Sequence, residues 1–210
     1  MRHLKIIALI CLSGFLISCK NETEPNATRN SGIEVQQAEK DRNEITLLVK
    51  NVYKWLNIAD GPSGFSPVTK DSLIVGYDHA DQKLYEKELS KSGLFAKEFV
   101  DNTARIFNKQ DELLRNGKAE WQEGDMPPFG GSDVNAWCRC QDQPTDDFDK
   151  INVVIEKMIS NTADLYWNWT GFGEDWENEH YHIKVVKENG RWKIAWMEGW
   201  DYEENVKLNY

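Results

Sequence analysis

Two histidines and two cysteines in the second half of the chain have spacings that suit metal binding. His180 and His182 alternate on a predicted strand, so both imidazoles face one side, and one residue separates Cys138 from Cys140. Zinc prefers such imidazole and thiolate ligands, and the four residues could form a two-Cys, two-His site. The alternative is two half-exposed histidines on an outer sheet face, with a disulfide or two free thiols. We favour this alternative and predict no metal and no cofactor, because the pairs lie forty residues apart and would have to meet in the fold.

Carboxylates that could act as general bases lie near the same segments. Asp142 follows the cysteine pair, and Asp164 lies on a predicted strand. A buried carboxylate has a raised pKa and can accept a proton near neutral pH. No nucleophile and base occur at a spacing typical of an enzyme, and Asp142 is better suited to bonding backbone N–H groups in a turn. We therefore predict no catalytic residue.

Aromatic rings are the third group of residues that could do chemistry. The chain has nine tryptophans, and Trp167, Trp169, Trp192 and Trp196 lie on predicted strands. Such rings fill a core by default, and they also stack on sugars or apolar ligands. We name these four rings, together with Asp142, as candidate pocket or rim residues.

Cys138 and Cys140 are also a possible disulfide or structural pair. An exported chain meets an oxidising compartment, where a disulfide can form. Residues two apart in a flat strand lie near the limit of disulfide reach, so a bridge here requires a bulge or a turn.

The N-terminus predicts export. Arg2 and Lys5 precede a short apolar run, Ile6–Ile17, as in a secretory signal peptide, which we assign to residues 1–18. The run is too short to span a bilayer.

The segment LISC, residues 16–19, resembles the lipobox of bacterial lipoproteins. In that family the signal is cut before the cysteine, and the cysteine carries the lipid. Cys19 is therefore the predicted lipid attachment site; the alternative is cleavage elsewhere, with Cys19 left as a free thiol. Lys20 stands where an aspartate would favour retention at an inner membrane, so we predict a cell-envelope protein of the outer membrane.

Acidic residues outnumber basic ones, and the net charge is −10. Removal of the signal peptide makes the charge more negative, because that segment carries two cations and no anion. An acidic surface repels phosphate backbones, which argues against a nucleic-acid partner. The predicted partners are the membrane, reached through the lipid anchor, and an unidentified small ligand or envelope protein.

Helices are predicted in the first half of the domain and strands in the second. Apolar residues recur at helical spacing before a long irregular stretch and alternate after it. The predicted segments are a flexible tether at 19–40, a single domain at 41–206, helices at 41–59, 81–92 and 94–116, a loop at 117–150, and strands at 151–159 and 163–170.

The strongest strand pattern is a β-hairpin at 180–200, closed by an Asn-Gly turn at 189–190. Asn-Gly supplies the two positive φ angles of a type I′ turn and so sets the register. Regular alternation then pairs Ile183 with Trp196 and buries the Trp196 ring in the core.

Helices followed by an antiparallel meander predict an α+β fold, with N-terminal helices packed on a curved, mainly antiparallel sheet of four or more strands. The helical layer and the closing Tyr-x-Ile-x-Val…Asn-Gly-x-Trp-x-Ile hairpin resemble the cone-shaped, cystatin-like fold of the nuclear transport factor 2-like superfamily. The CRCQD segment at 138–142, followed by the hairpin at 151–170, is similar to a family of bacterial lipoproteins of unknown function within it. The resemblance covers about residues 41–203. It implies a pocket between the helices and the concave sheet face, where enzymes of the superfamily place an Asp or His.

We expect a membrane-tethered cell-envelope lipoprotein that binds a small ligand or partner protein, which includes an immunity or accessory role. One alternative is an enzyme, a hydrolase or isomerase, that uses the cone pocket, and a second is a metal-handling lipoprotein. An open pocket with a buried carboxylate would favour the enzyme. A filled cone would favour protein binding and would move recognition to the loop at 117–150.

Overall fold

The structure is a computed structural model that describes residues 27–57 and 66–209. The predicted signal peptide at 1–18 and the lipid attachment site Cys19 lie outside the described residues. Within the described ranges, none of the helices combines the length and apolar character needed to cross a membrane.

The chain divides into two compact units, Met1–Gln37 and Ala38–Tyr210. In the first unit the described residues, 27–37, are helical.

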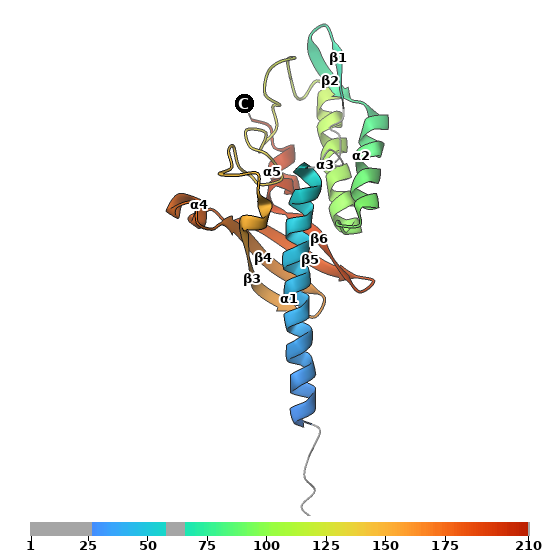
Figure 1. Ribbon diagram of the computed structural model, residues 1–210. Helices are drawn as coiled ribbons and strands as arrows, with labels where there is room; N and C mark the ends of the chain where they lie inside the picture. Colours follow the sequence, from blue (N-terminus) through green and yellow to red (C-terminus); the bar gives the residue numbers. More distant parts are fainter. Residues whose placement is uncertain (1–26, 58–65, 210) are drawn as a thin grey trace, which may run out of the picture. The chain divides into compact units, whose positions relative to one another are not determined.

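Helices precede a four-stranded antiparallel sheet in the chain, and a separate two-stranded sheet follows the first helix in the sequence and lies at one end of the second and third helices (Figure 1). The predicted α+β class is therefore confirmed, whereas the cone shape stays a prediction. The elements are α1 (Ala27–Asn57), β1 (Pro67–Lys70), β2 (Leu73–Tyr77), α2 (His79–Ser92), α3 (Lys97–Arg115), η1 (Phe148–Lys150), β3 (Ile151–Ile159), β4 (Thr162–Trp169), α4 (Glu174–Asn178), β5 (Tyr181–Glu188), β6 (Arg191–Met197), η2 (Glu198–Trp200) and α5 (Tyr202–Val206).

Helix α1 begins earlier than the sequence predicted. It starts at Ala27 rather than Asp41, so the expectation of an irregular tether is wrong for residues 27–40. Asp41 is a buried residue inside the helix rather than its N-cap. Once the buried stripe around Val49 fixes the later turns, the Glu, Gln, Ala and Lys residues before it extend the helix at low cost.

Helices α2 and α3 lie side by side (Figure 1). The Asp78 carboxylate caps α2 by accepting bonds from two amides of its first turn, and Gly93 closes the helix at a φ of 71°. The residues just before α3 are extended, so the predicted start of this helix at Leu94 is wrong. The Ala96 amide donates to the Ile194 carbonyl at 2.8 Å, and the Ile194 amide donates to the Leu94 carbonyl at 2.9 Å. This segment therefore covers part of the edge of β6.

The four-stranded sheet has the order β3-β4-β5-β6, which is the predicted meander. Strand β3 has the predicted bounds, Ile151–Ile159. Asn189 and Gly190 have φ angles of 51° and 78°, as a type I′ turn requires. The predicted hairpin turn is therefore confirmed.

The register of the last hairpin departs from the prediction after Ile194. A β-bulge shifts the pairing, so that Lys184 faces Trp196 and Ile183 faces Met197. The predicted partnership of Ile183 with Trp196 is therefore wrong. Met197 is buried and Trp196 is only half-buried. The alternation of apolar and polar residues did not reveal the bulge, because Trp196 and Met197 are adjacent and both apolar. Alternation cannot tell which of two such residues faces inward.

Aromatic rings fill the space between α1 and the sheet. Trp167 and Trp169 of β4 are completely buried. Tyr53 of α1 meets the Trp167 ring edge-on, with ring centroids 4.8 Å apart, and Phe148 stacks on Tyr53 at 4.9 Å. The Tyr53 hydroxyl accepts a bond from Trp167 Nε1 and donates to the Trp137 carbonyl. Side chains thus pack together where the resemblance implied a pocket.

Candidate functional site

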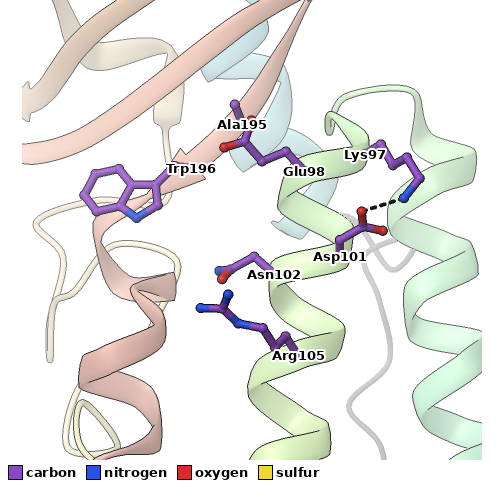
Figure 2. A pocket seen from close by; sticks show the side chains of 7 residues that line it. All are labelled: Lys97, Glu98, Asp101, Asn102, Arg105, Ala195 and Trp196. Atoms are coloured by element: carbon purple, nitrogen blue, oxygen red, sulfur yellow. Dashed lines mark hydrogen bonds and ion pairs between the residues drawn. The ribbon is translucent and has the colours of Figure 1, made fainter.

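A groove of about 460 Å³ lies between helix α3 and strand β6 (Figure 2). Residues of α3 form one side of the groove, and two residues at the bulged end of β6 form the other. The lining residues are Lys97, Glu98, Asp101, Asn102, Arg105, Ala195 and Trp196.

The α3 wall presents three side chains in a row. Glu98, Asn102 and Arg105 are spaced by four and then three residues, so they share one helix face. In Figure 2 the Asn102 and Arg105 side chains extend from α3 toward the β6 side. A short stretch of helix therefore supplies an anion, an amide and a cation to one wall.

The end of the chain holds two of these side chains in place. Asn102 Nδ2 donates to the Trp200 carbonyl at 2.8 Å, and the Arg105 guanidinium carbon lies 3.6 Å from the centroid of the Tyr202 ring. A cation over an aromatic face is attracted by the ring quadrupole. These contacts to η2 and α5 fix both side chains before any ligand arrives.

The charges in the groove are only partly neutralised. Lys97 and Asp101 form an ion pair with Nζ and Oδ2 2.5 Å apart (Figure 2). Glu98 and Arg105, by contrast, form no ion pair within the part of the chain that the structure describes. They lie two helical turns apart on α3, which is too far for them to neutralise each other directly. The groove therefore offers one anion and one cation to a ligand.

The predicted rim residue Trp196 lies at this groove. Its ring projects away from α3 in Figure 2, and the Lys184 ammonium lies 5.5 Å from the ring centroid. The bulge at Ala195 turns Trp196 away from the core, and both Ala195 and Trp196 line the groove as a result. Of the four candidate tryptophans, Trp196 alone lines this groove.

The other three candidate tryptophans belong to the core. Trp167 and Trp169 have no exposed surface, and Trp192 is almost fully buried. Trp192 Nε1 donates to Asp41 Oδ1 at 2.9 Å, and Lys187 pairs with the same oxygen. Trp192 thus joins β6 to α1, and none of the three rings forms a pocket wall of the groove.

The disulfide alternative for the cysteine pair is realised. Cys138 and Cys140 are bridged, with Cα atoms 5.1 Å apart. The required turn is present, because Arg139 has a φ of 50° and the Asn135 amide donates to the Cys140 carbonyl at 2.9 Å.

Asp142 lines a second surface pocket, of about 380 Å³, beside this disulfide. Trp176 and Glu179 also line it. Asp142 itself is exposed at this pocket, not buried in the core.

The structure does not assemble the proposed two-Cys, two-His site. The disulfide uses both sulfurs that would have bound the metal. His180 stacks on Tyr166 with ring centroids 3.9 Å apart, and His182 Nδ1 lies 3.9 Å from a carboxylate oxygen of Glu156. Across the described ranges, no three His, Cys, Asp or Glu side chains gather as metal ligands would.

Sequence reasoning missed a polar cluster around Asp111 of α3. Asp111 Oδ2 lies 2.7 Å from Arg115 Nε and 3.0 Å from His79 Nε2, and Oδ1 accepts the Tyr77 amide at 2.7 Å. Gly76 permits this approach, because a Cβ there would lie 2.6 Å from Asp111 Oδ1. The cluster ties β2 to α3.

Competing effects set the charge of Asp111. Burial by itself raises the pKa of this carboxyl, but the bonds from Arg115, the Tyr77 amide and His79 outweigh burial and hold the pKa below its ordinary value of 3.8. Asp111 is therefore a carboxylate at neutral pH, fully engaged in structural bonds, and is unsuited to act as a base.

Comparisons with protein-family models, with curated proteins and with solved structures find no match to this chain.

Proposed function

We propose that this chain is a lipid-anchored protein of the bacterial cell envelope that binds its ligand or partner in a surface groove. Cys19 carries the anchor, and the groove between α3 and β6 is the binding site. The protein works by recognition rather than catalysis.

The packed interior is the observation that carries the binding proposal. An enzyme of the cone type needs an acid or base facing an interior pocket. In the described core, Tyr53 lies between α1 and the sheet, and its hydroxyl is bonded to both Trp167 and Trp137. Burial raises the pKa of Tyr53 far above its ordinary value, which keeps the hydroxyl protonated. We therefore place ligand binding on the surface of the protein.

Two further observations support the location and the site. The lipobox at 16–19 and the disulfide between Cys138 and Cys140 are both typical of an exported protein. The groove presents an exposed anion and an exposed cation with an amide between them, and binding sites are typically concave with a few placed polar groups. The surface pocket beside Asp142 is the second candidate site, because most of the residues that line it belong to the predicted loop at 117–150, and binding residues tend to gather in loops.

Two measurements test the proposal. For the anchor, cells expressing the full gene are labelled with radioactive palmitate and fractionated. For the groove, the purified protein is heated with a low-molecular-weight extract of the envelope, and its melting temperature is measured. We expect label and membrane retention in the wild type and in Cys11→Ala, and loss of both in Cys19→Ala. The Cys11 variant is the matched control, because it lies within the predicted signal but outside the lipobox.

The thermal readout uses a second pair of variants. The extract is expected to raise the melting temperature of the wild type and of Arg191→Glu, but not of Arg105→Glu. Both substitutions reverse one exposed arginine, and Arg191 lies at the opposite end of β6 from the groove. Equal palmitate label in Cys19→Ala would contradict the anchor, and an undiminished shift in Arg105→Glu would contradict the groove.

A further inference from the structure

We propose that the groove between α3 and β6 binds a short peptide of about three residues with a free amino group and a free carboxylate. This inference rests on the proposed function, because it names the class of ligand for the same groove.

The two unpaired charges of the groove point to a zwitterion. Glu98 can accept hydrogen bonds from an ammonium group, and Arg105 can hold a carboxylate through two parallel bonds. A ligand with only negative charge would be attracted by Arg105 but repelled by Glu98. A ligand with only positive charge would meet the opposite conflict. A zwitterion lying along the helix satisfies both ends.

The spacing of the charges selects the length of the ligand. Glu98 and Arg105 are seven residues apart on α3, which corresponds to about 10 Å along a helix axis. An extended peptide advances about 3.3–3.6 Å per residue, so three residues cover nearly the same distance. A single amino acid is too short to reach both side chains. The groove volume of about 460 Å³ accommodates a ligand of this size.

The middle of the groove suits a peptide backbone. Asn102 lies between the two charges, and its Nδ2 is already bonded to the Trp200 carbonyl. The side-chain oxygen of Asn102 is then the atom left to accept an N–H from the ligand. Ala195 also lines the groove, and its small methyl group leaves room for the chain.

The site is already organised for such a ligand. The stacking of Arg105 on Tyr202 and the bond from Asn102 restrict both side chains before binding. Ordering a free side chain costs affinity, so this restriction favours binding. The Lys97–Asp101 pair neutralises the other two charges of the wall and leaves Glu98 and Arg105 as the two charges that a ligand meets.

Calorimetric titration of the full chain in detergent tests the inference, with trialanine, N-acetyl-trialanine and trialanine amide as probes. We expect trialanine to bind and each blocked peptide to bind about tenfold or more weakly, because each loses one charge-assisted contact. Arg105→Gln and Glu98→Gln should each weaken trialanine binding by a similar factor. The matched control Arg191→Gln should leave trialanine binding unchanged.

The pairing of charges is tested by combining peptides with variants. Trialanine amide should bind Arg105→Gln as well as it binds the wild type, because the carboxylate contact is already lost. N-acetyl-trialanine should likewise bind Glu98→Gln and the wild type equally.

The absence of trialanine binding, or equal binding of blocked and unblocked peptides, would overturn the inference. If the envelope extract still stabilised the wild type but not Arg105→Glu, the proposed function would stand without this ligand class. Loss of both responses would overturn the inference and the groove proposal together.

Discussion

At the scale of single residues, Asp111 is a buried carboxylate that bonds Arg115, His79 and the Tyr77 amide. Replacement by Asn keeps one acceptor but removes the charge that Arg115 and His79 face. We expect Asp111→Asn to lower the free energy of unfolding by about 1.5–3 kcal/mol at pH 7, the usual value for hydrogen bonds to a charged group. Urea unfolding of both proteins measures the difference.

The difference in unfolding free energy between the wild type and Asp111→Asn should depend on pH. The pKa of Asp111 is lower in the folded than in the unfolded protein, so the stabilisation is present above the unfolded pKa, about 4, and is lost as pH falls through the lower folded pKa. The stability gap between wild type and Asp111→Asn should therefore stay constant from pH 7 to about pH 4 and shrink below it. Asp101→Asn, which breaks an exposed pair, should cost about 0.5 kcal/mol or less. A gap that widens on acidification would contradict this account.

The sequence predicted few of these residue contacts. It correctly required a turn at the Cys138–Cys140 pair, because chain geometry alone demands it. It could not predict that Asp41 bonds Trp192, since that contact joins residues far apart in the chain. The charged groove residues Glu98 and Arg105 were missed because solvent-exposed charges on a helix have no pattern that separates a site from a solvated face.

At the scale of elements, the bulge in β6 turns Trp196 out of the core. Trp167→Ala empties a fully buried position and should cost roughly 3–5 kcal/mol of stability. Trp196→Ala removes a half-buried ring that lies on the side away from the core, and should cost about 1 kcal/mol or less. Denaturant unfolding of the two variants at neutral pH checks both values. Equal, large losses for both would indicate the unbulged register with Trp196 inside.

Element prediction succeeded where local chemistry alone determines the structure. The Asn189-Gly190 turn and the bounds of β3 follow from turn residues and alternation. It failed where a neighbouring element decides the outcome. The extended segment before α3 exists because β6 offers it bonding partners, and α1 extends to Ala27 because its later turns are packed.

At the scale of the whole molecule, the order of helices and strands was sufficient to predict an α+β fold. The sequence left open whether the space between helices and sheet is empty or filled, because an aromatic residue on an inward face suits both. The ring contacts of Tyr53, Phe148 and Trp167 show that side chains occupy this region. The packed interior directs the functional proposal to the surface.

Amide hydrogen exchange tests the central claim, binding in the groove between α3 and β6, most directly. The full chain is exchanged with and without the low-molecular-weight envelope extract, and its peptides are analysed by mass spectrometry. The account predicts slower exchange in peptides from α3 (Lys97–Arg115) and β6 (Arg191–Met197), and no such slowing in Arg105→Glu. Slower exchange confined to the loop at 134–142 or to β4, or none anywhere in the wild type, would contradict it.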